Sequence, residues 1–171
     1  LSKNTAVERA RRPAPFYLLV CRSSYPNAAA LTAALMPAVL AGVPTILPLF
    51  AAPPPDDPPL AALELCGVER AFSGPLADIP DLLRALSGRR IGQETGPREP
   101  GRLLLLGESF FGPELLLEAA RCGVPVRCLL EGDVAGDAAP ALERDPSHAE
   151  VWIWPELTPD WFLNNRVRLF A

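Results

Sequence analysis

Short apolar runs alternate along this chain with segments of helical spacing, and this alternation limits the possible folds more than any other feature. The runs show little polar alternation, which is typical of strands that are buried on both faces of a parallel sheet. Strands that alternate with helices predict an α/β domain with a mostly parallel six-stranded sheet. The predicted strands are residues 16–20, 45–49, 70–72, 103–106, 126–130 and 151–154.

The passages from helix to strand repeat one phrase, AGVPTILPL at 41–49 and CGVPVRCLL at 122–130, and CGVERAF at 66–72 is a looser copy. A helix that ends at glycine and leads at once into a strand is half of a βαβ unit. The longest connection, residues 87–102, falls where a doubly wound sheet of strand order 3-2-1-4-5-6 crosses back. The pattern therefore predicts a three-layer, doubly wound, Rossmann-like fold.

Glycine and proline predict where individual helices begin and end. Gly67, Gly88 and Gly123 are predicted to follow the ends of three helices. The first helix is expected to have Pro26 at its first position, and the proline-rich residues 51–59 are expected to form an extended loop. The residues expected to share a face of the first helix are Leu31, Leu35, Val39 and Leu40.

The length of 171 residues fits one domain, residues 1–171, with residues 155–171 as a C-terminal docking tail. This tail leaves the repeating pattern and carries Trp161, Phe162 and Phe170. Aromatic side chains bury large areas, so the tail is expected to dock on its own domain or on a partner chain, including a second copy.

Charge and hydropathy exclude several classes of partner. The formal net charge of −4 argues against a nucleic-acid platform, for which a basic face is expected. The apolar runs are interrupted by proline and glycine before they reach the length of about 18 residues that a membrane span needs. The first residues, LSKNTAVERARRP, do not resemble a secretory signal, so a cytoplasmic protein is expected.

The four cysteines, Cys21, Cys66, Cys122 and Cys128, form no C-x-x-C pair and are expected to be buried thiols. The single histidine, His148, lies in a charged stretch and is expected at the surface. Since a metal site needs several such ligands, no metal is expected.

A ligand is expected at the two loops that follow the first and fourth predicted strands, because these meet at the switch point of a doubly wound sheet. The first loop places Cys21, Arg22, Ser23 and Ser24 ahead of a helix N-terminus, an arrangement that suits a nucleotide or another small anion. Two alternatives remain open: Arg22-Ser23-Ser24 as ordinary helix capping, and Cys21 as a nucleophile rather than a buried thiol. The second loop supplies Gly107, Glu108 and Ser109.

In their order, the segments MPAVLAGVPTILPLFAAPPP, CGVERAFSGPLADIPDLL, LLLLGESFFGPELLLEA and APALERDPSHAEVWI resemble histidinol dehydrogenase, and more loosely the aldehyde-dehydrogenase-like superfamily. The resemblance runs from about Phe16 to Ile153. It implies NAD-dependent oxidation with a zinc ion and a glutamate–histidine base pair. The family's zinc-binding glutamine and histidine would fall on Ala141 and Arg144, and a guanidinium cannot bind a metal.

The family's cofactor loops are also altered in this chain. Arg22-Ser23 replaces its glycine pair, and Gly107-Glu108-Ser109-Phe110 replaces its Gly-Pro-Gly-Asn loop. The sequence therefore favours a dehydrogenase-like domain that binds a nucleotide or small anion, with NAD or NADP as candidate cofactors and no oxidoreductase activity on its own. The alternatives are a non-catalytic scaffold or regulatory interaction module, and an unrelated small α/β enzyme that uses Cys21 or Glu108.

Overall fold

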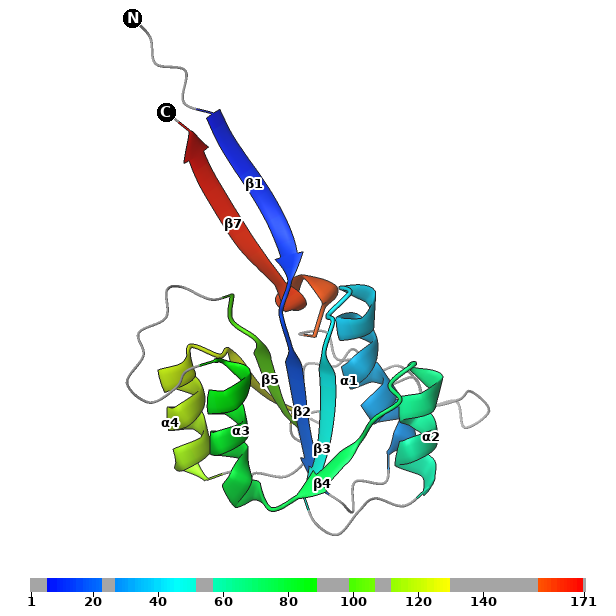
Figure 1. The fold of residues 1–171 in the computed structure, drawn as a ribbon. Helices are drawn as coiled ribbons and strands as arrows, with labels where there is room; N and C mark the ends of the chain where they lie inside the picture. Colours follow the sequence, from blue (N-terminus) through cyan, green and yellow to red (C-terminus); the bar gives the residue numbers. More distant parts are fainter. Residues whose placement is uncertain are drawn as a thin grey trace, which may run out of the picture.

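The computed structural model describes residues 6–22, 27–51, 57–88, 99–106, 112–129 and 157–170, with the side chains of 6–9, 22 and 166–170 left out (Figure 1). Its centre is a parallel five-stranded sheet of order β4-β3-β2-β5-β6. This order confirms the prediction for the first five strands, and the sixth predicted strand, 151–154, lies outside the described residues. The strands are β2 (Tyr17–Arg22), β3 (Ile46–Ala51), β4 (Phe72–Gly74), β5 (Arg102–Leu106) and β6 (Val126–Leu129).

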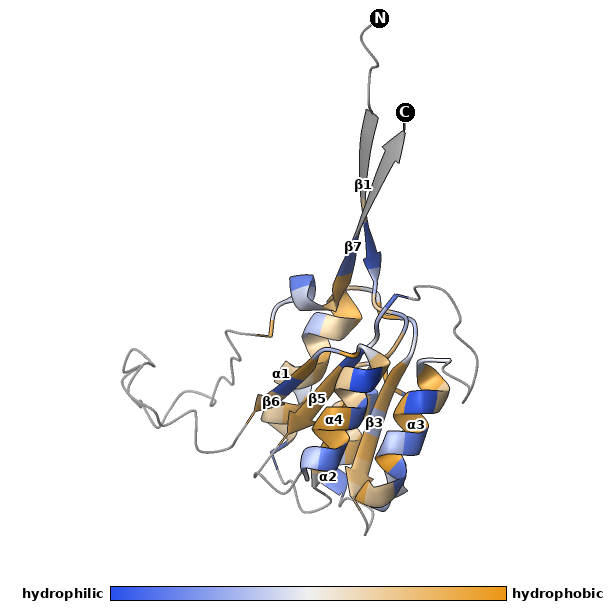
Figure 2. Ribbon diagram, turned by 90° about the vertical axis from the view of Figure 1, so that its left-hand side faces the viewer, coloured by the Kyte–Doolittle hydropathy of each residue, from blue (hydrophilic) through white to orange (hydrophobic). Residues whose placement is uncertain are grey.

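Four α-helices accompany the sheet in the described part of the chain: α1 (Ala28–Leu40), α2 (Asp57–Leu65), α3 (Ile79–Leu86) and α4 (Pro113–Cys122). Successive residues of β2 enter two different core clusters because side chains alternate along a strand. Tyr17, Leu19 and Cys21 pack in one cluster with α1 and α2. Leu18 and Val20 pack in the other with α3 and α4. The central strands are correspondingly hydrophobic, as the orange β3 in Figure 2 shows.

The predicted helix ends at Gly67, Gly88 and Gly123 are confirmed, since all three have the positive φ that favours glycine. The proline-rich loop is corrected: α2 begins at Asp57, so the predicted loop 51–59 reaches into the first turn of a helix. Proline fits there because the first amides of a helix have no partner within it. The third predicted strand, 70–72, is shifted to Phe72–Gly74, where it pairs with the end of β3.

The predicted buried face of α1 is partly wrong. Leu31 and Leu35 are buried, but Leu40 is 70% exposed. Leu40 follows Leu31 by nine residues, and at about 100° per residue this is about two and a half turns of helix. The two side chains therefore lie on opposite sides of α1. The buried residues of α1 are instead Ala30, Leu31, Ala34, Leu35 and Ala38.

A second, two-stranded sheet joins the two ends of the chain. β1 (Ala6–Pro13) pairs antiparallel with β7 (Leu163–Phe170) over eight residue pairs, from Ala6 opposite Phe170 to Pro13 opposite Leu163. This ribbon projects away from the parallel sheet (Figure 1). The sequence pattern did not predict it, because neither strand has a continuous apolar run.

The base of the ribbon is packed onto the parallel sheet through the short 3₁₀ helix η3 (Pro159–Phe162). Phe162 is fully buried, and its ring meets that of Tyr17 edge-on, with centroids 4.8 Å apart. The Ala14 N–H donates to the Phe162 carbonyl at 2.7 Å, which joins the two segments below the ribbon. Phe162 thus belongs to the core of this chain, and the half-buried Trp161 packs against it.

The side chain of Arg102, the first residue of β5, is buried at this junction and donates hydrogen bonds to residues on both sides of it. Its side chain is only 6% exposed, and its Nε donates to the Trp161 carbonyl. Nη1 donates to the carbonyls of Pro100 and Gly101, at 3.1 and 3.0 Å. Nη2 donates to the Leu163 carbonyl at 3.2 Å and to Asn164 Oδ1 at 2.9 Å. The guanidinium therefore links the start of β5 to the start of β7.

Among the described residues, no helix has the length and apolar character that crossing a bilayer requires.

Candidate functional site

The two predicted ligand loops begin at neighbouring strand ends. β2 and β5 are adjacent and parallel, and Cys21 lies opposite Leu106 at their carboxyl ends. The helix after β2 packs in the core cluster of α1 and α2, whereas the helix after β5 packs in the other cluster. This divergence is the topological switch point at which open α/β sheets bind ligands. Among the predicted site residues, Ser23, Ser24, Gly107, Glu108 and Ser109 lie outside the described residues.

The first turn of α1 follows the carboxyl end of β2 in the chain. The helix begins at Ala28 rather than at Pro26, because Asn27 is its N-cap and accepts a hydrogen bond from the Ala30 N–H at 3.0 Å. Asparagine is among the residues most favoured at the N-cap, so Asn27 is the sequence signal that marks the start of α1. The prediction at Pro26 did not use this signal. No acidic residue lies in the first turn, so the positive end of the helix dipole is not offset by a carboxylate of its own first turn.

The first turn of α4 differs in charge. Its N-cap is Gly112, which provides no side-chain cap, and Pro113 follows at the first position. Glu114 lies in this first turn and is exposed. A carboxylate at a helix N-terminus interacts with the dipole by about 0.3–1 kcal/mol and repels an incoming anion. Of the two helices at the switch point, α1 is therefore the better anion-binding terminus.

Cys21 stands at the end of β2, but its side chain turns into the core. The thiol is fully buried and lies 3.8 Å from the Leu49 carbonyl, to which it donates. Burial raises the pKa of the Cys21 thiol well above its ordinary value, so the nucleophilic thiolate is disfavoured at neutral pH. Of the two alternatives for Cys21, the structure favours the buried thiol. The side chain of its neighbour Arg22 is outside the described part.

The other cysteines divide by burial. Cys66 and Cys122 are buried, as predicted, whereas Cys128 on β6 is exposed, contrary to the prediction. Within the described residues β6 is paired on one side only, with β5, so its side chains are less completely covered there than those of the central strands. The described residues contain no group of three or more histidine, cysteine or acidic side chains that could hold a metal ion.

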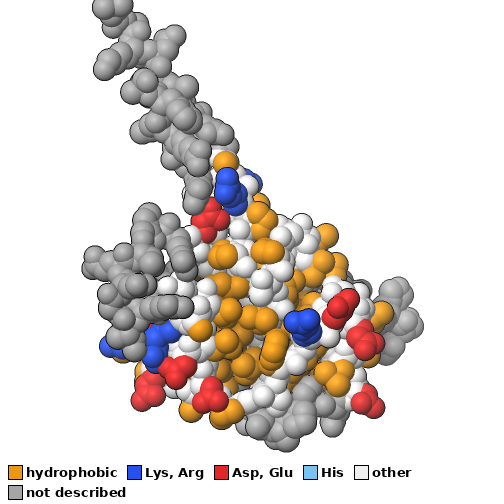
Figure 3. All heavy atoms as spheres, in the orientation of Figure 1, with side chains coloured by type: hydrophobic (Ala, Val, Ile, Leu, Met, Phe, Trp, Pro, Cys, Tyr) orange, Lys and Arg blue, Asp and Glu red, His pale blue; other side chains and the backbone are white. Residues whose placement is uncertain are grey.

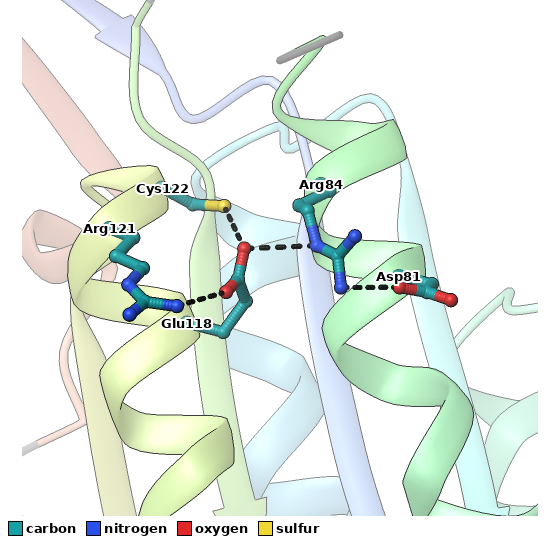
Figure 4. Close-up of polar contacts among 5 residues, drawn as sticks. All are labelled: Asp81, Arg84, Glu118, Arg121 and Cys122. Atoms are coloured by element: carbon teal, nitrogen blue, oxygen red, sulfur yellow. Dashed lines mark hydrogen bonds and ion pairs between the residues drawn. The ribbon is translucent and has the colours of Figure 1, made fainter. Parts of the chain in front are cut away.

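A polar cluster that the sequence pattern did not reveal lies between α3 and α4 (Figure 4). Glu118, 12% exposed, has its Oε1 atom 3.1 Å from Arg84 Nε and its Oε2 atom 3.5 Å from Arg121 Nη1. Arg84 also pairs with Asp81 at 2.5 Å, and the Cys122 thiol lies 3.8 Å from Glu118 Oε1. The spacings Asp81–Arg84 and Glu118–Arg121 are visible in the sequence, but the pair that joins the helices is not.

This cluster is arranged for helix packing rather than for catalysis. Each of the two carboxylate oxygens of Glu118 faces an arginine, Arg84 on α3 and Arg121 on α4. The ion pair between Glu118 and Arg84 links α4 to α3, whose Leu115 and Leu83 pack in the same core cluster. The polar cluster therefore lies between the two helices, away from the switch point at the strand ends.

The chain matches no family model and no curated protein. Among solved structures it is similar to one described as an aldehyde dehydrogenase, PutA from Anabaena variabilis, with 21% identity and a TM-score of 0.48. The similarity covers 74% of this chain and 25% of that chain, so the chain spans about a quarter of the length of that protein.

Proposed function

We propose that this chain is a dehydrogenase-like domain that binds a nucleotide or another small anion at the carboxyl ends of β2 and β5, without oxidoreductase activity on its own. The observation that carries the proposal is the adjacency of Cys21 and Leu106 at a point where the following helices diverge. The six-stranded, three-layer, Rossmann-like form of the fold, the histidinol-dehydrogenase resemblance and a cytoplasmic location are parts of the same proposal.

In this proposal the phosphate of the ligand lies at the start of α1. Arg22 supplies a fixed positive charge, and Ser23 and Ser24 supply hydroxyl donors next to the helix N-terminus. The loop after β5 contributes Gly107, Glu108 and Ser109 to the proposed contacts with the ligand. NAD and NADP are the candidate cofactors, because both carry a pyrophosphate.

The lack of catalysis is supported by two observations. The Cys21 thiol is buried with a raised pKa, so it does not serve as a ready nucleophile. The positions that correspond to the family's zinc ligands hold Ala141 and Arg144. A partner chain or a second copy that binds through residues 155–171 stays a prediction.

A thermal-shift panel with NAD, NADP, ATP and inorganic phosphate tests the binding proposal. A ligand at 100 times its dissociation constant adds about 2.7 kcal/mol, which corresponds to a rise in Tm of about 5–11 °C for a chain of this size. Arg22→Ala is expected to abolish the shift. Arg70→Ala is the matched control, because Arg70 is exposed and precedes β4, which is separated from β2 by β3.

Two results would contradict the proposal. A panel with no shift would remove the anion site, and a shift that Arg22→Ala leaves unchanged would place the ligand elsewhere. Activity is tested separately with histidinol and simple aldehydes in the presence of NAD or NADP. Turnover above the buffer rate would show that the catalytic part of the proposal is wrong.

A further inference from the structure

The antiparallel register of the ribbon interleaves arginines from the two ends of the chain. Five consecutive residue pairs, from Glu8–Arg168 to Arg12–Asn164, each contain one arginine. β1 provides three of them and β7 provides two; they are Arg9, Arg11, Arg12, Arg166 and Arg168. Because successive pairs of a ribbon alternate between its two faces, Arg12, Arg166 and Arg168 share one face and Arg9 and Arg11 share the other.

The charge of the ribbon is opposite to that of the remaining chain. The ribbon strands contain five arginines and one acidic residue, Glu8, so their formal charge is 5 − 1 = +4. The whole chain has a formal charge of −4, which leaves −4 − 4 = −8 on all other residues. The expectation of no nucleic-acid partner came from the whole-chain charge, which averages over these two parts.

The arginines nearest the base of the ribbon are accessible to solvent. Arg11 and Arg12 are exposed, and basic side chains are visible at the base of the ribbon in Figure 3. Arg11 Nη1 lies 3.2 Å from Asp160 Oδ1, with both side chains largely exposed to solvent (66% and 76%). An ion pair between two exposed side chains is weak in water, so it does not prevent Arg11 from binding another anion.

The ribbon is held at a defined position by its base. Asn164, which faces Arg12 in the register, is buried and receives a hydrogen bond from Arg102. Its Nδ2 atom donates to the Pro100 carbonyl at 3.1 Å. An isolated two-stranded ribbon is only marginally stable in water, so this anchor and a bound partner would both stabilise it.

We propose that the β1–β7 ribbon binds the phosphate backbone of a nucleic-acid duplex. Arginine forms bidentate hydrogen bonds with phosphate, and all the basic residues of the ribbon are arginines. Five pairs at about 3.4 Å per residue extend over about 14 Å, and the major groove of B-DNA admits a two-stranded ribbon. A second copy of the chain fits less well, because the centres of protein–protein interfaces are depleted of charge.

Fluorescence anisotropy with a labelled 20-base-pair DNA duplex and the full chain tests this proposal. If the three arginines of one face contact phosphates, the association constant falls about 40-fold between 50 and 200 mM NaCl, because each contact adds about 0.9 to the salt slope. Arg166→Ala/Arg168→Ala leaves one arginine on that face and is expected to reduce this factor to about 3–4-fold and to weaken binding at 50 mM NaCl. Arg166→Lys/Arg168→Lys keeps the charge and is expected to keep most of the salt dependence.

Arg70→Ala/Arg121→Ala is the charge-matched control, because both arginines are exposed and lie outside the ribbon. It is expected to bind the duplex more like the unchanged protein than the ribbon variant does. Circular dichroism spectra that match the unchanged protein show that each variant is folded. The proposal is overturned if the duplex does not bind at 50 mM NaCl, or if both double variants weaken binding equally. It is also overturned if the ribbon variant loses binding only to phosphatidylserine vesicles, or only self-association in light scattering, while duplex binding is unchanged.

Discussion

Arg102 holds the start of β7 against the start of β5, and its removal tests how the two ends of the chain are attached to the sheet. Arg102→Ala deletes the donors to four carbonyls and to Asn164 Oδ1. The acceptors at Gly101 and Asn164 belong to fully buried hydrogen bonds, whereas the other three bonds are partly accessible to water. The two buried acceptors therefore determine most of the expected loss.

A buried acceptor without its donor costs about 1–3 kcal/mol, so the two together predict a loss of about 2–6 kcal/mol in the free energy of unfolding. At about 2–4 °C per kcal/mol, a central value of about 4 kcal/mol lowers Tm by about 8–16 °C. One opposing effect is present: burial lowers the pKa of the Arg102 guanidinium, which shows that desolvation of the charge costs energy in the folded state. The loss is therefore expected in the lower half of this range.

Urea unfolding followed by far-ultraviolet circular dichroism measures this loss. Arg102→Met keeps most of the side-chain volume, so the loss that Met and Ala share reports the missing hydrogen bonds. Arg102→Lys retains a charged donor without the planar fork and is expected to recover part of the loss. A free energy of unfolding for Arg102→Met within about 0.5 kcal/mol of the unchanged protein would refute the argument, since surface substitutions alone reach that size.

Three further predictions follow from described contacts. A Cβ atom on Gly101 would overlap the Phe16 ring, so Gly101→Ala is expected to cost about 1–3 kcal/mol in thermal unfolding, whereas Gly74→Ala, with nothing within 4 Å, is expected to be nearly neutral. Glu118→Gln removes the charge between Arg84 and Arg121 and is expected to cost about 1–2 kcal/mol in urea unfolding; a loss no larger than that of the exposed Glu114→Gln would contradict it. Burial raises the pKa values of Tyr17 and Cys21, so the folded state keeps protons that the unfolded state releases. Their contribution is complete below the unfolded pKa values and is lost as pH rises toward the folded ones, so stability should fall by up to about 1.4 kcal/mol per pH unit for each group above about pH 9. Tyr17→Phe should flatten the decline above about pH 10, and an unchanged slope would speak against it.

The sequence by itself determined the parallel core. The apolar runs that became β2 and β5 must be hidden from water on both faces, and only a sheet covered by helices does this. Gly67, Gly88 and Gly123 could be predicted because a left-handed residue at a helix end is a local requirement that one residue type meets without strain. Even the inward direction of the Cys21 side chain follows from the alternation that buries Tyr17 and Leu19.

The sequence predicted which strand ends meet at the candidate ligand site, but not the local structure around it. The strand order puts Cys21 beside Leu106, as the sequence pattern indicated, but α1 begins at Ala28, two residues after the predicted start at Pro26. The link between Arg84 and Glu118 could not be predicted, because it depends on how closely α3 and α4 approach each other. Such a distance is set by the packing of the whole core cluster rather than by either helix.

The pairing of β1 with β7 is evident only from the tertiary structure. Its first pair joins Ala6 to Phe170, and the five arginines come together on one ribbon only in the antiparallel register. Buried strands are recognisable because their side chains must avoid water. The polar strands of the ribbon are held mainly by backbone hydrogen bonds, which nearly every residue can form, so the sequence did not mark which segments would meet.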